Sequence, residues 1–134
     1  MPKKRRDEEK GIKMAKQLSS YFVSLVRDAC LKAFWRKRTL AFFLKQNHIS
    51  DSAVAPLFQG MTKAEVLSNI FDKLSINQNS KTQSVILGIA KELSEMDTFP
   101  DLSGLDDSNL KINTAKHSVD ILRKALVKLE AMYY

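Results

Sequence analysis

The sequence predicts an all-α domain, a compact bundle of about five helices, and three observations support this prediction. The chain has 134 residues, of which 44% are hydrophobic and 28% charged, as is usual for one globular domain with a single core. Only four glycines and three prolines are present, too few for the frequent tight turns of an all-β sandwich or barrel. The apolar residues of several segments recur at intervals of three and four, the period of one face of a helix.

The first predicted helix runs over residues 7–36 and carries one apolar stripe. We expect a basic arm over residues 1–10, followed by a single helical domain over residues 11–134. We also expect Trp35, beside Phe34 and on the other side of the helix from the stripe, to belong to the core. Cys30 is expected to be a small packed residue. The stripe consists of Met14, Leu18, Tyr21, Phe22, Leu25, Ala29 and Ala33.

Two shorter elements are predicted next. A helix over residues 39–46 places Leu40, Phe43 and Leu44 inward, and Asn47 is expected to take a left-handed position at its end. Residues 50 and 51, serine and aspartate, can open a further helical turn, which the proline at position 56 keeps short unless it lies in the first turn.

Two capping boxes predict a pair of helices in the centre of the chain. Thr62 and Glu65 form the first box, ahead of an apolar run that starts at residue 66. Ser80 and Gln83 are expected to form the second, with residues 77–79 as the loop between the helices.

The C-terminal part of the chain combines a long loop with a long helix. Phe99, Leu102 and Leu105 are expected to fold back on the core from a loop over residues 96–108. A helix that starts near residue 108 carries apolar residues at alternating intervals of three and four, the heptad pattern of a coiled-coil seam. This seam is either buried within the domain or pairs with a partner helix. Its members are Ile112, Ala115, Val119, Leu122, Leu126, Leu129 and Tyr133.

The excess positive charge lies in the first quarter of the chain. Residues 1–38 hold 12 Lys or Arg and 4 Asp or Glu, a net charge of +8, whereas residues 39–134 have a net charge of −1. Basic residues next to an aromatic ring are typical of sites for single-stranded nucleic acid, although a basic run can equally be a solvated chain end. The candidate phosphate contacts are Lys3, Lys4, Arg5, Arg6, Arg36, Lys37 and Arg38.

Other classes of protein are disfavoured by what the sequence lacks. Its one cysteine cannot form an internal disulfide, and it has neither a signal peptide nor an apolar run of transmembrane length. His48 and His117 have no neighbouring ligands at metal-binding spacing, and no catalytic motif is present. We therefore expect a cytoplasmic protein without a metal, a cofactor, a membrane contact or an enzymatic activity of its own.

Four segments resemble the helical N-terminal domains of bacterial abortive-infection proteins of the AbiJ kind. They are Trp35–Leu44, Thr62–Leu67, Ile89–Leu93 and Phe99–Leu102, and the resemblance covers residues 15–130. It implies a sensing, regulatory or assembly role ahead of a toxic or nucleolytic effector domain. The related HEPN nucleases carry an arginine that is separated from a histidine by four to six residues, and neither histidine here has an arginine at that spacing. The resemblance therefore does not imply nuclease activity for this chain.

These observations predict a non-catalytic interaction or regulatory module, expected in a bacterial antiphage defence system. Its partner would be a protein or an effector domain, with homo-oligomerisation as a further possibility. The alternative is a protein that binds DNA or RNA through its basic N-terminal quarter. The two differ in their response to salt, because phosphate contacts weaken steeply as the salt concentration rises. An enzyme would need a partner domain to supply its chemistry.

Overall fold

The computed structural model describes residues 17–133, apart from the side chain of Tyr133, and this part of the chain is helical with no strand. The all-α prediction is therefore confirmed. Six α-helices and two 3₁₀ helices follow one another along the chain. They are α2 (Ser20–Ala33), α3 (Lys37–Gln46), α4 (Asp51–Val54), η1 (Ala55–Phe58), α5 (Lys63–Ile76), α6 (Ser80–Ser94), η2 (Pro100–Leu102) and α7 (Ser108–Tyr133).

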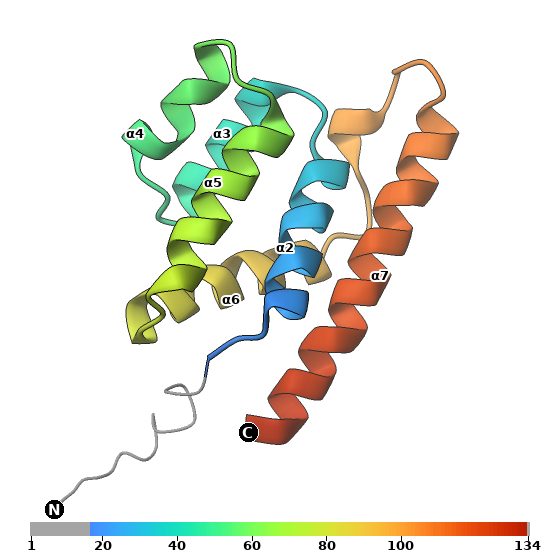
Figure 1. The fold of residues 1–134 in the computed structure, drawn as a ribbon. Helices are drawn as coiled ribbons and strands as arrows, with labels where there is room; N and C mark the ends of the chain where they lie inside the picture. Colours follow the sequence, from blue (N-terminus) through green and yellow to red (C-terminus); the bar gives the residue numbers. More distant parts are fainter. Residues whose placement is uncertain (1–16, 134) are drawn as a thin grey trace, which may run out of the picture.

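Helix α2 is the centre of the fold. It packs against α5, α6 and α7, and Figure 1 shows it between α5 and α7 with α6 passing behind. Helix α4 and η1 lie on the opposite side of α5 from α7 (Figure 1). The C-terminal half of α2 carries Ala29, Cys30 and Ala33, all fully buried, and such small side chains let neighbouring helices approach closely. The expectation that Cys30 is a packed residue is confirmed.

The predicted long first helix begins later than expected. Helix α2 starts at Ser20, because Ser19 is extended and its Oγ accepts a hydrogen bond from Phe22 N at 3.0 Å. Ahead of this cap, Leu18 is not helical, and its backbone N and O bind the side-chain amide of Gln78 at 2.7 and 3.0 Å. The prediction of one continuous helix through Leu18 is therefore wrong. The part of that helix predicted over residues 7–16 lies outside the described residues.

The C-terminal end of α2 also differs from the prediction. The helix stops at Ala33, and Phe34 adopts an extended backbone that turns the chain into α3. Phe34 remains buried, with its ring centroid 4.7 Å from that of Phe43. The turn directs Trp35 outward, where it is 49% exposed, and Tyr21 at the other end of the helix is 67% exposed. The expectation that Trp35 belongs to the core is therefore wrong, and Tyr21, a member of the predicted apolar stripe, faces solvent.

The two short elements that follow agree with the prediction except at one residue. Leu40, Phe43 and Leu44 are buried in α3 as expected. The left-handed conformation after this helix belongs to His48, with φ of 70°, and not to Asn47, whose φ is −100°. The Asn47 side chain instead donates to the carbonyl of Phe43 and to Glu92 of α6, which holds its backbone in a different conformation. The turn predicted at residues 50 and 51 is α4, capped by the residue 50 hydroxyl and continued by η1.

Capping boxes begin both central helices, the second of them one residue earlier than predicted. At α5, Thr62 Oγ1 accepts from Glu65 N at 3.1 Å and Glu65 Oε1 accepts from Thr62 N at 2.9 Å. These hydrogen bonds to the backbone and side chain of Thr62 hold the pKa of Glu65 below its usual value. At α6 the cap is Asn79, which pairs with Thr82, so the box predicted from Ser80 is wrong. Asparagine and serine are equally good N-caps, so the sequence allowed the helix to begin after either residue 79 or residue 80.

Replacing Thr62 with alanine is expected to lower the free energy of unfolding by about 1 kcal/mol, because the Glu65 amide loses its partner at the helix start. Urea denaturation of both proteins measures the difference. The matched control is Thr98→Ala, at an exposed threonine that makes no hydrogen bond among the described residues, and its effect should stay within about 0.5 kcal/mol. Equal losses for the two variants would contradict a capping role.

The heptad seam of α7 is buried within the domain. Ala115, Val119, Leu122 and Leu126 are all less than 8% exposed, and α7 packs against α2 and α6. At the two ends of this run, Ile112 and Leu129 are half-buried and pack against the core, whereas the Tyr133 side chain lies outside the described part. The loop residues Phe99 and Leu102 are buried and Leu105 is half-buried, as predicted.

Candidate functional site at the α2–α3 corner

The chain reverses direction between α2 and α3, and one carboxylate from η2 holds this corner together. Asp101 Oδ2 accepts hydrogen bonds from the backbone N of Trp35 and, at 2.9 Å, of Arg36. Its Oδ1 accepts from Thr39 Oγ1 and Arg36 Nη1, both at 2.9 Å. The α3 N-cap, Arg36, makes no capping hydrogen bond with its own side chain, and its backbone N–H is instead bound by a residue 65 positions away.

The environment of Asp101 favours its charged form. Its side chain is 8% exposed, and burial by itself opposes ionisation. The hydrogen bonds from Arg36, Thr39 and Trp35 together outweigh that burial and hold the pKa of Asp101 below its usual value. Asp101 is therefore a carboxylate at neutral pH and forms an ion pair with Arg36.

The predicted basic contacts therefore have different environments. Arg36 is paired with Asp101, and Lys37 donates from Nζ to the carbonyl of Met61 at 3.0 Å, so both stabilise the corner. Arg38 is exposed and has no hydrogen bond or ion pair among the described residues. The four cations predicted before them, Lys3, Lys4, Arg5 and Arg6, lie outside the described residues.

Two lysines from distant parts of the chain converge on Trp35. Lys63 Nζ, from the first residue of α5, lies 4.8 Å from the indole centroid, and Lys111 Nζ, from α7, lies 5.0 Å from it. Both are cation–π distances. Lys63 Nζ also donates to the backbone carbonyls of Phe34 and Trp35, and Lys111 Nζ donates to the carbonyl of Asp106. The fold thereby adds two positive charges beside the predicted run at residues 36–38.

Lys63 is partly buried at this corner, and its pKa reflects that burial. Burial lowers the pKa of Lys63 below its usual value; the charge of Asp101 opposes that shift and the charge of Lys37 adds to it. A lysine at the first position of a helix is also disfavoured by the helix dipole. Its hydrogen bonds to the free carbonyls after α2 offset these costs, since those carbonyls would otherwise lack a partner.

An open cavity of about 420 Å³ adjoins the indole. Its lining is mostly apolar and includes three lysines but no acidic residue. Its lining residues come from the end of α2, the start of α5, η2 and the first two turns of α7. They are Leu31, Lys32, Trp35, Lys63, Leu102, Leu110, Lys111 and Thr114.

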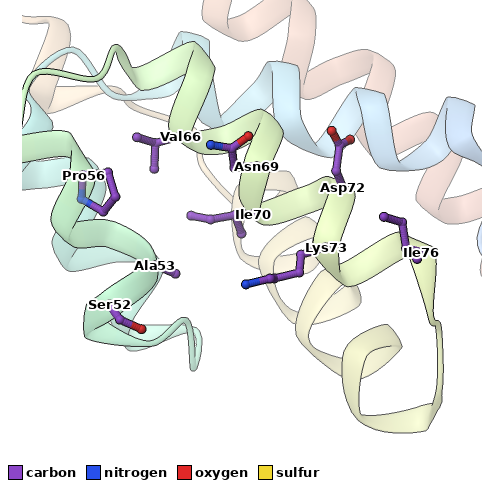
Figure 2. A pocket seen from close by; sticks show the side chains of 9 residues that line it. All are labelled: Ser52, Ala53, Pro56, Val66, Asn69, Ile70, Asp72, Lys73 and Ile76. Atoms are coloured by element: carbon purple, nitrogen blue, oxygen red, sulfur yellow. The ribbon is translucent and has the colours of Figure 1, made fainter.

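A second cavity, of about 480 Å³, lies in the groove between α4 and α5. In Figure 2, Ile70 and Lys73 of α5 extend across the groove toward Ala53 and Ser52 of α4. Its lining is mostly apolar, and at its end Ile76 is 71% exposed. No cluster of cations adjoins it, so it differs in chemistry from the cavity at Trp35.

Sequence reasoning missed Lys63, Lys111 and Asp101 as members of the site. Lys63 carried one usable signal, because a cation directly after an N-cap opposes the helix dipole and so points to a tertiary partner. Lys111 carried none, since lysines on exposed helix faces are common. Asp101 lay within an aspartate-containing loop, where carboxylates usually cap local turns.

The described residues contain no group of three or more histidine, cysteine, aspartate or glutamate side chains placed to hold a metal ion. Within the same part of the chain, none of the helices combines the length and apolar character needed to cross a membrane. Comparison of the chain with protein-family models, curated proteins and solved structures finds no match.

Proposed function

We propose that this chain is a non-catalytic module that binds nucleic acid through the basic corner between α2 and α3 and the basic residues that precede α2. The observation that carries the proposal is the convergence of Lys63 and Lys111 on the half-exposed ring of Trp35, three residues before the exposed Arg38. Positive side chains around an exposed aromatic ring suit a polyanion whose bases can stack. The excess of basic residues over residues 1–38 adds a sequence-independent attraction for phosphates.

The buried seam of α7 makes assembly through that helix the weaker alternative. Val119, Leu122 and Leu126 already contact the rest of the domain and are not available to a partner helix. The protein partner or effector domain expected from the AbiJ resemblance, and a place in antiphage defence, stay predictions. An apolar segment of such a partner would bind in the α4–α5 groove. Binding there would persist at high salt, because it depends on apolar contacts.

Binding of labelled DNA and RNA, single- and double-stranded, is expected to weaken steeply between about 50 and 200 mM salt in fluorescence-anisotropy titrations. Removal of residues 1–10, which hold five Lys or Arg, should weaken it further. The double variant Lys32→Gln, Lys111→Gln should bind less tightly at both salt concentrations. For a single strand, its plot of log affinity against log salt should be shallower by about 0.7 for each phosphate that the variant no longer neutralises.

The matched control is Lys81→Gln, at an exposed lysine in the first turn of α6, next to the loop that contacts the start of α2. It removes one charge at the end of α2 opposite Trp35, so it is compared with Lys32→Gln and Lys111→Gln made singly, each of which should lower affinity much more. Absence of binding at the lower salt concentration, or equal losses for the corner and control variants, would contradict the proposal.

A further inference from the structure

We propose that the cavity beside Trp35 holds one unpaired nucleotide of a bound strand, with its base against the indole and the apolar wall and its phosphate on the lysines. This inference rests on the proposed nucleic-acid binding. It specifies the place at which a strand is held and the form of nucleic acid that the protein prefers. Three features of the cavity lead to it.

The first feature is an apolar surface that no other part of the described chain covers. Trp35 is the sole tryptophan and is 49% exposed, and Leu110, which lines the same cavity, is 67% exposed. Leu102 forms a buried part of the lining. A cavity of about 420 Å³ is within the size range of small-ligand sites, and a flat base is the part of a nucleotide that such a surface accommodates.

The second feature is the charge at the rim. Lys63 and Lys111 place their ammonium groups within 5.0 Å of the same ring centroid, and Lys32 lines the same cavity. No lining residue is acidic, and the carboxylate of Asp101, whose charge acts on Lys63, is already bound to Arg36 and the backbone of the corner. A phosphate at the rim would relieve the repulsion between like charges that the fold holds close together.

The third feature is the concave shape of the cavity, which favours single strands over duplexes. The bases of a duplex are stacked on one another, and a protein can enclose one of them only after it has left the stack. An unpaired nucleotide in a single strand enters without that cost. The cavity should therefore give single strands an advantage that the basic residues alone, which contact phosphates of either form, do not provide.

Because Trp35 is the only tryptophan, its fluorescence reports directly on the cavity. Titration of the full chain with single strands of thymidine or uridine, about ten nucleotides long, is expected to quench this fluorescence. A DNA duplex of the same length should bind, by anisotropy, without comparable quenching. In anisotropy titrations, Trp35→Ala should lower single-strand affinity about tenfold and duplex affinity much less.

A second variant tests the cavity without removing the ring. Leu110→Glu places a negative charge in the cavity from an exposed position in the first turn of α7, where an acidic residue suits the helix dipole, so folding should be retained. It should lower single-strand affinity at least tenfold. The matched control, Val127→Glu, adds the same charge at an exposed position of α7 nearly five turns away and should have a smaller effect.

Failure of this inference is distinguishable from failure of the proposed function. Salt-dependent binding of single strands without quenching of Trp35, or with equal effects of Leu110→Glu and Val127→Glu, would overturn the cavity site and leave nucleic-acid binding in place. Equal quenching by the duplex and the single strand would overturn the selectivity. No binding of any probe at about 50 mM salt would overturn both.

Discussion

Leu122→Ala is expected to lower the free energy of unfolding by about 3 kcal/mol, one of the two largest effects that the structure predicts. The Leu122 side chain is fully buried in the interface that α7 forms with the rest of the domain. Its truncation removes apolar packing and leaves a cavity between helices that only partly relax. Urea denaturation followed by circular dichroism at 222 nm, a helix-sensitive wavelength, measures the loss.

The matched control for this variant is Val127→Ala in the same helix. Val127 is 59% exposed, so its truncation should change stability by no more than about 0.5 kcal/mol. The comparison also tests the alternative that the sequence left open. If the seam paired with a partner helix, Leu122→Ala would alter the oligomeric state in sedimentation while leaving monomer stability nearly unchanged, and that result would contradict the buried seam.

Asp101→Ala is expected to cost about 2–3 kcal/mol of stability at neutral pH. The change leaves the amides of Trp35 and Arg36 and the hydroxyl of Thr39 without their acceptor, and it removes the ion pair with Arg36. The control is Asp120→Ala on α7, where an exposed carboxylate pairs with Arg123 and the effect should be about 0.5 kcal/mol or less. Similar effects for both variants would show that Asp101 does not hold the corner.

The same carboxylate gives the stability a predictable dependence on pH. Because the pKa of Asp101 is lowered in the folded protein, its contribution is fully present above the ordinary aspartate pKa of about 3.9. It is lost as the pH falls through the lower folded value. The stability difference between the wild-type protein and Asp101→Ala should therefore be constant near neutrality and narrow below about pH 4. A difference that widens on acidification would contradict this assignment.

The parts of the fold that could be predicted are those determined by local sequence. Thr62 and Glu65 mark a helix start because their capping hydrogen bonds span only three residues, and the heptad interval predicts that Val119 and Leu122 share a face. The start of α2 was missed because the apolar interval continues through Leu18, whereas the backbone there is held by Gln78, 60 residues away. A contact over that distance leaves no periodic signal.

The candidate site could be predicted only in part, for a related reason. The basic run at residues 36–38 next to Trp35 indicated the right corner of the molecule, but Arg36 and Lys37 have partners within the chain. The charges that converge on the indole come from α5 and α7, and their convergence depends on how these helices pack against α2. Trp35 was predicted to be buried because helical periodicity was extended past Ala33, where the helix ends.

The burial of Cys30 in the C-terminal half of α2 makes the folded chain resistant to thiol chemistry. Its sulfur is fully buried, and burial raises the pKa of the thiol, so neither an alkylating reagent nor an oxidant meets a reactive thiolate in the native state. Modification requires α2 to separate from the helices packed around it, so the rate of labelling by a small reagent measures how often the domain opens. The labelling rate of the single cysteine thus reports how often the core opens. Its burial also prevents the folded protein from forming a disulfide with a second copy under oxidising conditions.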